Sequence, residues 1–545
     1  MRALTVLYGG SLAPQAFEPA LNGKSAFSLA LERAGAFPGS EKTLLLVTEG
    51  ADLPDPPPGK LSVAARREWT VSELCRVLSA EAADFDFAYY GWADSPFLDP
   101  SLAGKLAERH VRYGAEYSYA DGWPLGLGPE LIGSAPAGIL FKIAGDDGKG
   151  PVNRETLFSI LQKDINSFDI ETEISPVDLR CHRLSLTADS KRNLLLLSRF
   201  ARAGCAGAAE AEQIVADHPE FLRTLPAFFP LQVSGPCPGG ALAGKTGACP
   251  LCPYPLFGAR DGTVADRGDF LDPGDFEKLL DKIENFAGDG VIDLSLWGEL
   301  SLHPRRDDLI RAVLERPALS LVIESSGLGW GALENYAAWA AAAPKRRNGL
   351  PPLSWIISLH GKDLPRGKEF SGQELPGAGS PFPESVSFVK ALAAAFPREP
   401  GTGDRVYVQA VRTAGAEDEI ETFYRAWKAY GADQPGPAII IQKYDSFCGF
   451  LPERQAVDLS PVERRPCWHL MRDFPVLIDG TVPVCREDLD CTVTGFPGAS
   501  RGLGNILREE AETIWNRGAE LYRSHCEKSY EKLCARCDEY YTYNF

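Results

Sequence analysis

Short apolar runs recur along both halves of the chain, separated by segments with helical periodicity. Such runs, bounded by polar turns, are typical of strands buried on both faces, and alternation with helices is typical of parallel α/β folds. In the first half we expect strands at Leu4–Tyr8, Leu44–Val47 and Phe85–Tyr90. In the second half we expect strands at Val291–Leu296, Leu319–Glu324, Trp355–Leu359, Val406–Val411 and Ala438–Gln442, with helices at Phe276–Phe286, Asp307–Glu315 and Glu417–Tyr430.

The length of 545 residues exceeds one domain of roughly 100–200 residues, so we expect several α/β domains. Residues 1–190 read as an α/β sandwich with a parallel sheet. Residues 191–228 are rich in Leu and Ala and read as a helical linker. Residues 229–450 predict a barrel or partial (β/α) barrel, and residues 451–545 a small cysteine-rich domain.

The formal net charge of −18 argues against binding to nucleic acids or anionic membranes, because the long-range field repels phosphate groups. No stretch approaches the ~20 apolar residues that span a bilayer, so we expect a cytoplasmic protein. In a reducing compartment, cysteine pairs spaced two apart indicate metal or cluster ligands more than disulfides. Most of the thirteen cysteines lie in the second half, where we therefore expect the chemistry.

Three of these cysteines, Cys237, Cys249 and Cys252, lie in a Gly- and Pro-rich loop before the predicted barrel. Tight loops can bring several thiolates to one iron–sulfur cluster. A four-iron cluster with three cysteine ligands keeps one iron open for another ligand. The loop alone is equally compatible with a structural zinc site that has a fourth ligand elsewhere, or with buried thiols.

The segments after this loop follow an ordered pattern. A predicted strand, Val291–Leu296, is followed by Trp297-Gly298-Glu299 and Leu302-His303-Pro304. Two further strands end in the segments Leu321–Gly327 and Ile356–Leu359. In this order, after the cysteine loop, they resemble the radical S-adenosylmethionine (SAM) superfamily.

In that superfamily a Gly-Gly-Glu-Pro-like motif at the end of a barrel strand receives the amino group of SAM. By resemblance, the SAM-binding residues are Gly298, Glu299, Ser326 and Ser358, and the ligands of the SAM-binding [4Fe–4S] cluster are Cys237, Cys249 and Cys252. The family's loop is usually C-x3-C-x2-C, whereas the first gap here holds eleven residues. Either an insertion lengthens the loop, or Cys237 is not a ligand.

The C-terminal region contains a second cysteine pattern. Cys467 and Cys485 flank a segment that predicts a hairpin turning at Asp479-Gly480, and Cys534 and Cys537 follow a predicted helix. With residues 407–451, this pattern resembles the SPASM domain of the spiro-SPASM family. No cysteine follows Cys537, so the resemblance implies one auxiliary [4Fe–4S] cluster, bound by Cys467, Cys485, Cys534 and Cys537, with Cys491 and Cys526 as alternates. The same four thiolates would also suit zinc.

The N-terminal domain carries Tyr8-Gly9-Gly10, Asn22–Ser25 and Gly91–Pro100. These segments resemble nucleotidyltransferases of the sugar-nucleotide or cytidylyltransferase kind. The resemblance implies that Asp94 holds Mg²⁺ and that Lys24 contacts a nucleotide phosphate. The family's Gly-x-Gly-Thr-Arg loop is absent, which predicts nucleotide binding with little turnover.

The combined resemblance predicts an enzyme that reductively cleaves SAM to a 5′-deoxyadenosyl radical, which abstracts hydrogen from a peptide or small-molecule substrate. An electron donor such as flavodoxin or ferredoxin would be its partner. The alternative is a non-catalytic zinc- or cluster-stabilised binding protein with a degenerate SAM site and a nucleotide-binding N-terminal domain.

Overall fold

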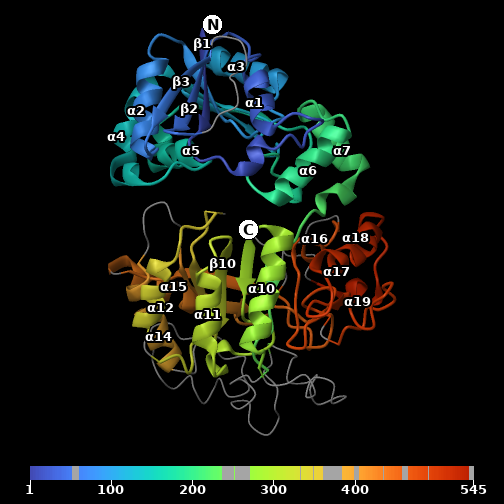
Figure 1. Ribbon diagram of the computed structural model, residues 1–545. Coiled ribbons are helices and arrows are strands. Elements are labelled where there is room, and N and C mark those ends of the chain that lie inside the picture. The colour runs from blue at the N-terminus through green and yellow to red at the C-terminus, as the bar shows by residue number, and fades with distance from the viewer. Residues whose placement is uncertain are drawn as a thin grey trace. The chain divides into compact units, whose positions relative to one another are not determined.

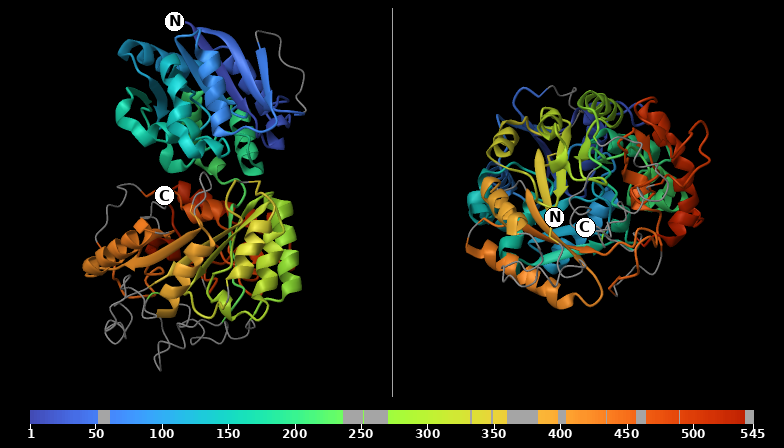
Figure 2. Two further views of the ribbon diagram at one scale, coloured as in Figure 1. Left: turned by 90° about the vertical axis from the view of Figure 1, so that its left-hand side faces the viewer. Right: turned by 90° about the horizontal axis from the view of Figure 1, so that it is seen from below.

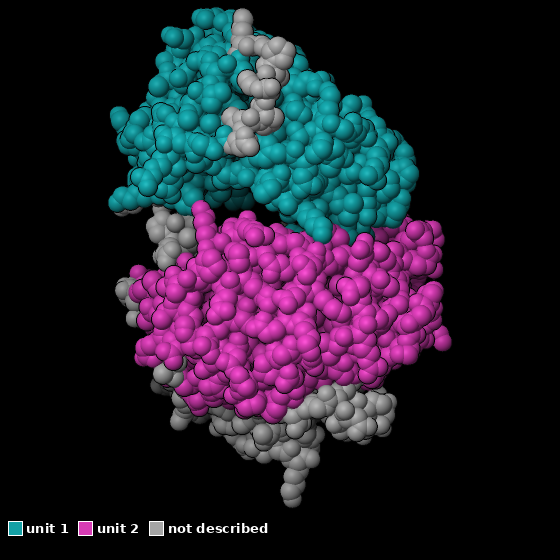
Figure 3. Space-filling view, viewed as in Figure 1, with its two compact units in different colours: residues 1–224 teal, residues 225–545 magenta. Residues whose placement is uncertain are grey.

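The computed structural model divides the chain into two compact units, Met1–Thr224 and Leu225–Phe545 (Figure 1, Figure 3). The residues it describes are 1–51, 61–235, 251, 270–331, 333–347, 349–359, 383–397, 404–433, 435–456, 464–488 and 490–538. Among these residues, no helix has both the length and the apolar character that a membrane crossing requires.

A seven-stranded sheet in the order β3-β2-β1-β4-β6-β5-β7 forms the centre of the first unit. β6 is antiparallel to both of its neighbours, and the other pairs are parallel. The strands are β1 (Ala3–Gly9), β2 (Ser40–Thr48), β3 (Leu61–Arg66), β4 (Phe87–Trp92), β5 (Tyr117–Asp121), β6 (Glu130–Gly133) and β7 (Ile170–Ile174). The three predicted strands are confirmed as β1, β2 and β4. β3 and β7 were not predicted, because these outer strands are half-exposed and lack a continuous apolar run.

The helices of this unit begin and end where capping residues allow. Ser25 caps α1 by accepting from the amide of Ser28 at 3.1 Å, and Gly114 ends α3 in the left-handed conformation with φ 64°. The helices are α1 (Ala26–Ala34), α2 (Val71–Ala82), α3 (Pro100–Tyr113), α4 (Ser134–Ala144), α5 (Thr156–Leu161), α6 (Lys191–Arg202) and α7 (Ala208–Asp217). Short 3₁₀ segments are Pro14–Phe17, Gly145–Lys149, Gln162–Ser167, Arg180–His182 and Pro219–Leu222. α6 and α7, which lie in the predicted linker 191–228, belong to the first unit.

The second unit contains a six-stranded, all-parallel sheet in the order β13-β12-β11-β10-β9-β8. Its strands are β8 (Phe228–Pro230), β9 (Gly290–Asp293), β10 (Leu319–Ser325), β11 (Leu353–Ser358), β12 (Val406–Arg412) and β13 (Ala438–Lys443). The flanking helices are α10 (Pro273–Ala287), α11 (Arg306–Leu314), α12 (Glu334–Ala342), α14 (Pro383–Ala395) and α15 (Glu417–Asp433), and Leu300–Leu302 forms a 3₁₀ turn. Every strand and helix predicted in this half is confirmed, although β9 ends at Asp293 instead of Leu296.

The sheet of the second unit has two different faces. Along β11, Leu353, Trp355 and Ile357 are fully buried, whereas the alternate residues are half-buried. Figure 2 shows the helices on the outer side of the curved sheet. The outer face is therefore the apolar core, and the inner face is left for polar residues.

The C-terminal region belongs to the second unit and shares its apolar core. Its elements are α16 (Trp468–Arg472), β14 (Thr481–Val482), β15 (Gly504–Asn505), α17 (Ala511–Arg517), α18 (Ala519–Cys526) and α19 (Lys532–Arg536). The predicted turn is present at Gly480, with φ 81°. The predicted hairpin is confirmed at its turn, where the amide of Leu477 donates to the carbonyl of Thr481 at 2.8 Å and the amide of Gly480 donates to that of Leu477 at 2.9 Å, and β14 pairs in addition with β15. The amides of Phe474 and Val476 donate to carbonyls of β8, at 2.9 and 2.8 Å, which extends the large sheet.

Candidate active site

The three loop cysteines predicted to bind the SAM cluster, Cys237, Cys249 and Cys252, lie outside the described residues. Their role as cluster ligands stays a prediction. The other predicted site residues are all described.

Gly298 and Glu299 follow β9 in a turn that admits only glycine at the first position. A Cβ atom at Gly298 would lie 1.7 Å from the carbonyl oxygen of Ser234. The preceding residue, Trp297, has a left-handed backbone with φ 52°, and its carbonyl accepts from Gln232 Nε2 at 3.2 Å. This close approach of two backbones turns the chain after β9 and directs Glu299 toward the end of β10.

Glu299 is buried, with 4% of its surface exposed, and it binds the end of β10. Its Oε1 accepts from Ser325 Oγ at 2.7 Å, and its Oε2 accepts from the amide and the hydroxyl of Ser326 at 2.9 and 2.8 Å. Burial raises the pKa of Glu299, although hydrogen bonds from the serines oppose the shift. The structure thus brings together two of the predicted SAM-binding residues, Glu299 and Ser326.

Ser358 belongs to a different polar group, on the inner face of the sheet. Ser358 Oγ donates to Glu324 Oε1 at 2.7 Å, and Gln409 Nε2 donates to the same oxygen at 2.9 Å. Asp293 ends the neighbouring strand β9, and burial raises its pKa to about 7, with the charge of Glu324 adding to the shift. These residues form a polar row across β9, β10, β11 and β12, in which Asp293, Glu324 and Ser358 lie at or near the carboxyl ends of their strands and Gln409 lies in the middle of β12.

Sequence reasoning missed Asp293, Glu324 and Gln409 as site residues. The available signal was a polar residue within a largely apolar strand, such as Glu324 in Leu319–Ser325 and Gln409 in Val406–Arg412. A polar residue costs free energy when buried without a partner, so its presence in such a strand points to a polar neighbour.

The C-terminal cysteines lie close enough to affect one another electrostatically. Burial, together with the neighbouring Cys537, raises the pKa of Cys467 and of Cys534 to about 12. Burial also raises the pKa of Cys485, with added contributions from Cys534 and Cys467. Among the described residues, however, no three Asp, Glu, His or Cys side chains form a group with metal-binding geometry.

Cys448 is a further member of this thiol group that sequence reasoning did not assign. It follows β13 and is hydrogen-bonded to Cys537, and this bond is the largest cause of its raised pKa, ahead of burial. Its backbone is left-handed, with φ 57°. Lys443, the last residue of β13, donates from its Nζ to the carbonyl of Asp538 at 2.9 Å. This hydrogen bond links the end of β13 to the residue that follows Cys537. The only signal in the sequence was a cysteine just after the last strand.

Thiols of this kind have the chemistry to bind a cation, although the described side chains do not stand in metal-binding geometry. Mutually close thiols raise one another's pKa, and a metal or cluster would relieve that repulsion and deprotonate them. Of the alternate ligands, Cys491 packs in a separate cluster with Leu296, Trp297 and Leu477, whereas Cys526 packs against the same large apolar core as Cys467 and Cys485.

In the first unit, Asp94 and Lys24 each pair with a different side chain. Asp94 is buried, with 1% exposure, and its Oδ2 lies 2.5 Å from Arg154 Nη2. Lys24 is exposed and pairs with Glu32 at 2.7 Å. Burial raises the pKa of Asp94, although the charge of Arg154 opposes the shift.

Arg154 was not predicted, since 60 residues separate it from Asp94. Its guanidinium stacks on Trp92 at 4.4 Å from the ring centroid and lies 3.4 Å from Asp189. A cation therefore already neutralises Asp94. This arrangement does not fit a Mg²⁺ ion at Asp94, because the ion would have to displace a partly buried guanidinium from a buried carboxylate.

Comparison with solved structures gives weak likenesses to two kinds of protein. A cytidylyltransferase from Leptospira borgpetersenii is 13% identical, covers 40% of this chain and 95% of its own, and has a TM-score of 0.33. BtrN in complex with AdoMet and 2-DOIA is 16% identical, covers 58% of this chain and 94% of its own, and also has a TM-score of 0.33. At these values the likenesses assign no activity to this chain.

No family model matches the chain. An uncharacterized protein of Treponema pallidum (strain Nichols) is 33% identical over 391 residues, which cover 71% of this chain and 98% of that protein. This identity and coverage establish common descent over most of the chain. The chain belongs to the same protein family as this Treponema pallidum protein.

Proposed function

We propose that the second unit is a radical SAM enzyme and that Glu299 binds the amino group of SAM. The observation that carries the proposal is a buried carboxylate held by Ser325 and Ser326 at the carboxyl ends of two adjacent parallel strands. Ligands of open parallel sheets bind at this edge. An ammonium group would compensate the burial that raises the pKa of Glu299.

Different residues of this pocket have different roles in binding. Ser326 holds the Glu299 carboxylate with two hydrogen bonds, which leaves lone pairs for a cationic group. Ser358, Glu324 and Gln409 hold one another across β10, β11 and β12 and offer polar groups to the cofactor or to the substrate. A peptide or small molecule is the proposed substrate, and flavodoxin or ferredoxin the proposed electron donor.

Two cofactor sites belong to this proposal. The SAM-binding [4Fe–4S] cluster would be held by Cys237, Cys249 and Cys252, and would supply the electron that cleaves SAM into methionine and a 5′-deoxyadenosyl radical. The auxiliary [4Fe–4S] cluster would be held by Cys467, Cys485, Cys534 and Cys537. The closeness of these last thiols supports a shared cation, and Cys448 lies beside Cys537.

Zinc is the alternative occupant of the C-terminal thiols, since tetrahedral thiolate sites suit both metals. It would make the protein a metal-stabilised binding protein with a degenerate SAM site. Iron, sulfide and zinc analysis of anaerobically purified protein separates the two. Roughly eight irons with matching sulfide support two clusters, whereas one or two zinc ions without iron would contradict the proposed enzyme.

A further inference from the structure

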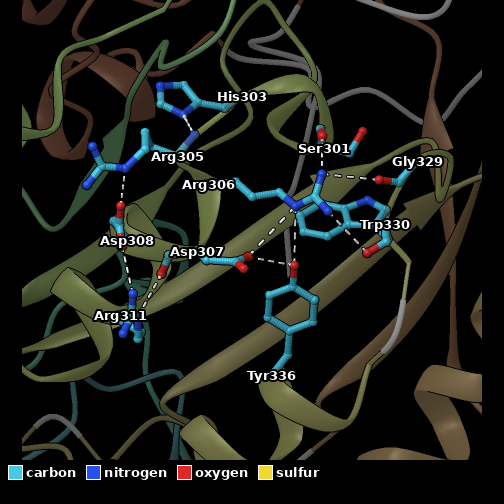
Figure 4. Close-up of polar contacts among 10 residues, drawn as sticks. All are labelled: Ser301, His303, Arg305, Arg306, Asp307, Asp308, Arg311, Gly329, Trp330 and Tyr336. Atoms are coloured by element: carbon cyan, nitrogen blue, oxygen red, sulfur yellow. Dashed lines mark hydrogen bonds and ion pairs between the residues drawn. The ribbon is translucent and has the colours of Figure 1, made fainter.

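The side chain of Arg306, the first residue of α11, joins the two loops that carry the Glu299 pocket (Figure 4). Its Nη1 donates to the carbonyl of Ser301, in the loop after β9, and to that of Gly329, in the loop after β10, the latter at 3.2 Å. Its Nη2 donates to the carbonyl of Trp330 at 3.4 Å, and the guanidinium lies 5.6 Å from the Trp330 ring centroid. One side chain therefore sets the spacing of both loops.

A second set of contacts links Trp330 to Glu299. Trp330 Nε1 donates to Ser325 Oγ at 2.7 Å, and the amide of Gly327 donates to the same oxygen at 3.0 Å. A serine hydroxyl has one proton to donate. Because both lone-pair positions of Ser325 are engaged, that proton is directed to Glu299 Oε1, at 2.7 Å. The orientation of the Glu299 carboxylate thus depends on the position of Trp330.

The charge of Arg306 is compensated by a neighbouring carboxylate. Its guanidinium lies 3.8 Å from Asp307, and its Nε donates to the hydroxyl of Tyr336, which donates to Asp307 at 2.9 Å. Arg306 therefore acts on Glu299 through geometry, with its charge compensated by a neighbour.

We propose that Arg306 is a positioning residue for SAM recognition: by holding Trp330 over Ser325 it directs the Glu299 carboxylate at the amino group of SAM. This inference rests on the proposed function of the pocket. It predicts that the effect of Arg306 is confined to ligands with that amino group.

The test measures the affinity of the anaerobically reconstituted full chain for SAM and for 5′-methylthioadenosine, which lacks the amino-acid moiety. Arg306→Ala should weaken SAM binding about tenfold, as expected for a misdirected hydrogen bond to a charged group, and leave 5′-methylthioadenosine binding unchanged. Trp330→Phe removes the Nε1 donor together with the pyrrole ring but keeps an aromatic ring beside Arg306, and it should give the same pattern, without an additive loss in the double variant. Arg305→Ala is the matched control, because Arg305 is exposed and pairs with Asp308.

The Glu299→Gln variant distinguishes failure of the proposed SAM pocket from failure of the proposed positioning role of Arg306. If Glu299→Gln binds SAM as the wild type does, the pocket assignment fails. If Glu299→Gln loses SAM affinity while Arg306→Ala and Trp330→Phe keep it, the positioning role alone is overturned. An equal loss of both ligands in the Arg306→Ala and Trp330→Phe variants would also overturn it, because it would reveal a merely structural contribution.

Discussion

Arg154 and Asp94 form a buried ion pair beside Trp92, with 2.5 Å between Nη2 and Oδ2. The guanidinium stands where the resemblance to nucleotidyltransferases predicts a magnesium ion. This ion pair leads to two predictions, one on metal binding and one on stability.

The ion pair predicts that Asp94 binds no divalent cation. In a Mn²⁺ titration of the full chain followed by EPR, the wild type and Asp94→Asn should bind the same number of ions. The physical reason is that Mn²⁺ would have to displace Arg154 from a carboxylate that is 1% exposed. If Asp94→Asn binds one ion fewer than the wild type, Asp94 is a metal ligand and this prediction is wrong.

The same pair should matter for stability far more than the exposed pair of Lys24. Arg154→Met should lower the free energy of unfolding by roughly 3 kcal/mol, because it leaves a buried carboxylate without a partner. Lys24→Met should change it by less than about 1 kcal/mol, since both partners are more than half exposed. Urea unfolding of both variants measures the difference, and equal effects would contradict the buried-pair account.

Glu130 predicts a stability change that depends on pH. Burial raises its pKa from 4.5 to about 7, while the hydrogen bond from Tyr117 opposes the shift. The unfolded chain therefore ionises Glu130 first, so the wild type loses stability between about pH 4.5 and 7. Glu130→Gln removes this cost and should gain on the order of 3 kcal/mol more at pH 8 than at pH 4.

Urea unfolding at the two pH values tests this prediction. Glu108→Gln, on the exposed side of α3, is the control and should show no comparable change. A Glu130→Gln variant whose advantage is equal at both pH values would show that Glu130 is not buried as a carboxylate in the folded protein.

The C-terminal thiols should stabilise the second unit through the metal or cluster that we propose they bind. Cys534→Ser with Cys537→Ser should lower both the iron content and the melting temperature, because cofactor binding is coupled to folding. Cys491→Ala should keep its iron, since Cys491 packs with apolar residues such as Trp297 and Leu477. Iron content is measured on anaerobically reconstituted protein. If Cys491→Ala loses iron and the variant with Cys534→Ser and Cys537→Ser does not, then Cys491 is a ligand, and Cys534 and Cys537 are not.

The sequence predicted contacts between neighbours in the sheet better than contacts between distant loops. The resemblance to the radical SAM superfamily implied that Glu299 and Ser326 share one site, and the parallel pairing of β9 with β10 brings the two residues together. Arg154 and Cys448 could not be placed, since their partners Asp94 and Cys537 are far away in the chain and no periodicity connects them.

The secondary-structure predictions show the same contrast between local patterns and contacts that are distant in the chain. Long apolar strands such as β10 and β11 were predicted, because burial on the core face leaves a clear pattern. The pairing of β14 with β15 was missed, although the turn at Gly480 was predicted and is present. A turn signal fixes only the local chain reversal, and it does not show that the segment around Phe474 pairs with β8 or that β14 pairs with β15.

The reductive cleavage of SAM tests the central claim most directly. Anaerobically reconstituted wild-type protein, reduced with dithionite and supplied with SAM, should form 5′-deoxyadenosine, quantified by liquid chromatography. Glu299→Gln should form it at least about tenfold more slowly at subsaturating SAM, because the amino group loses a charge-assisted hydrogen bond. Absence of 5′-deoxyadenosine from iron-loaded wild-type protein, or equal formation by Glu299→Gln, would contradict the account.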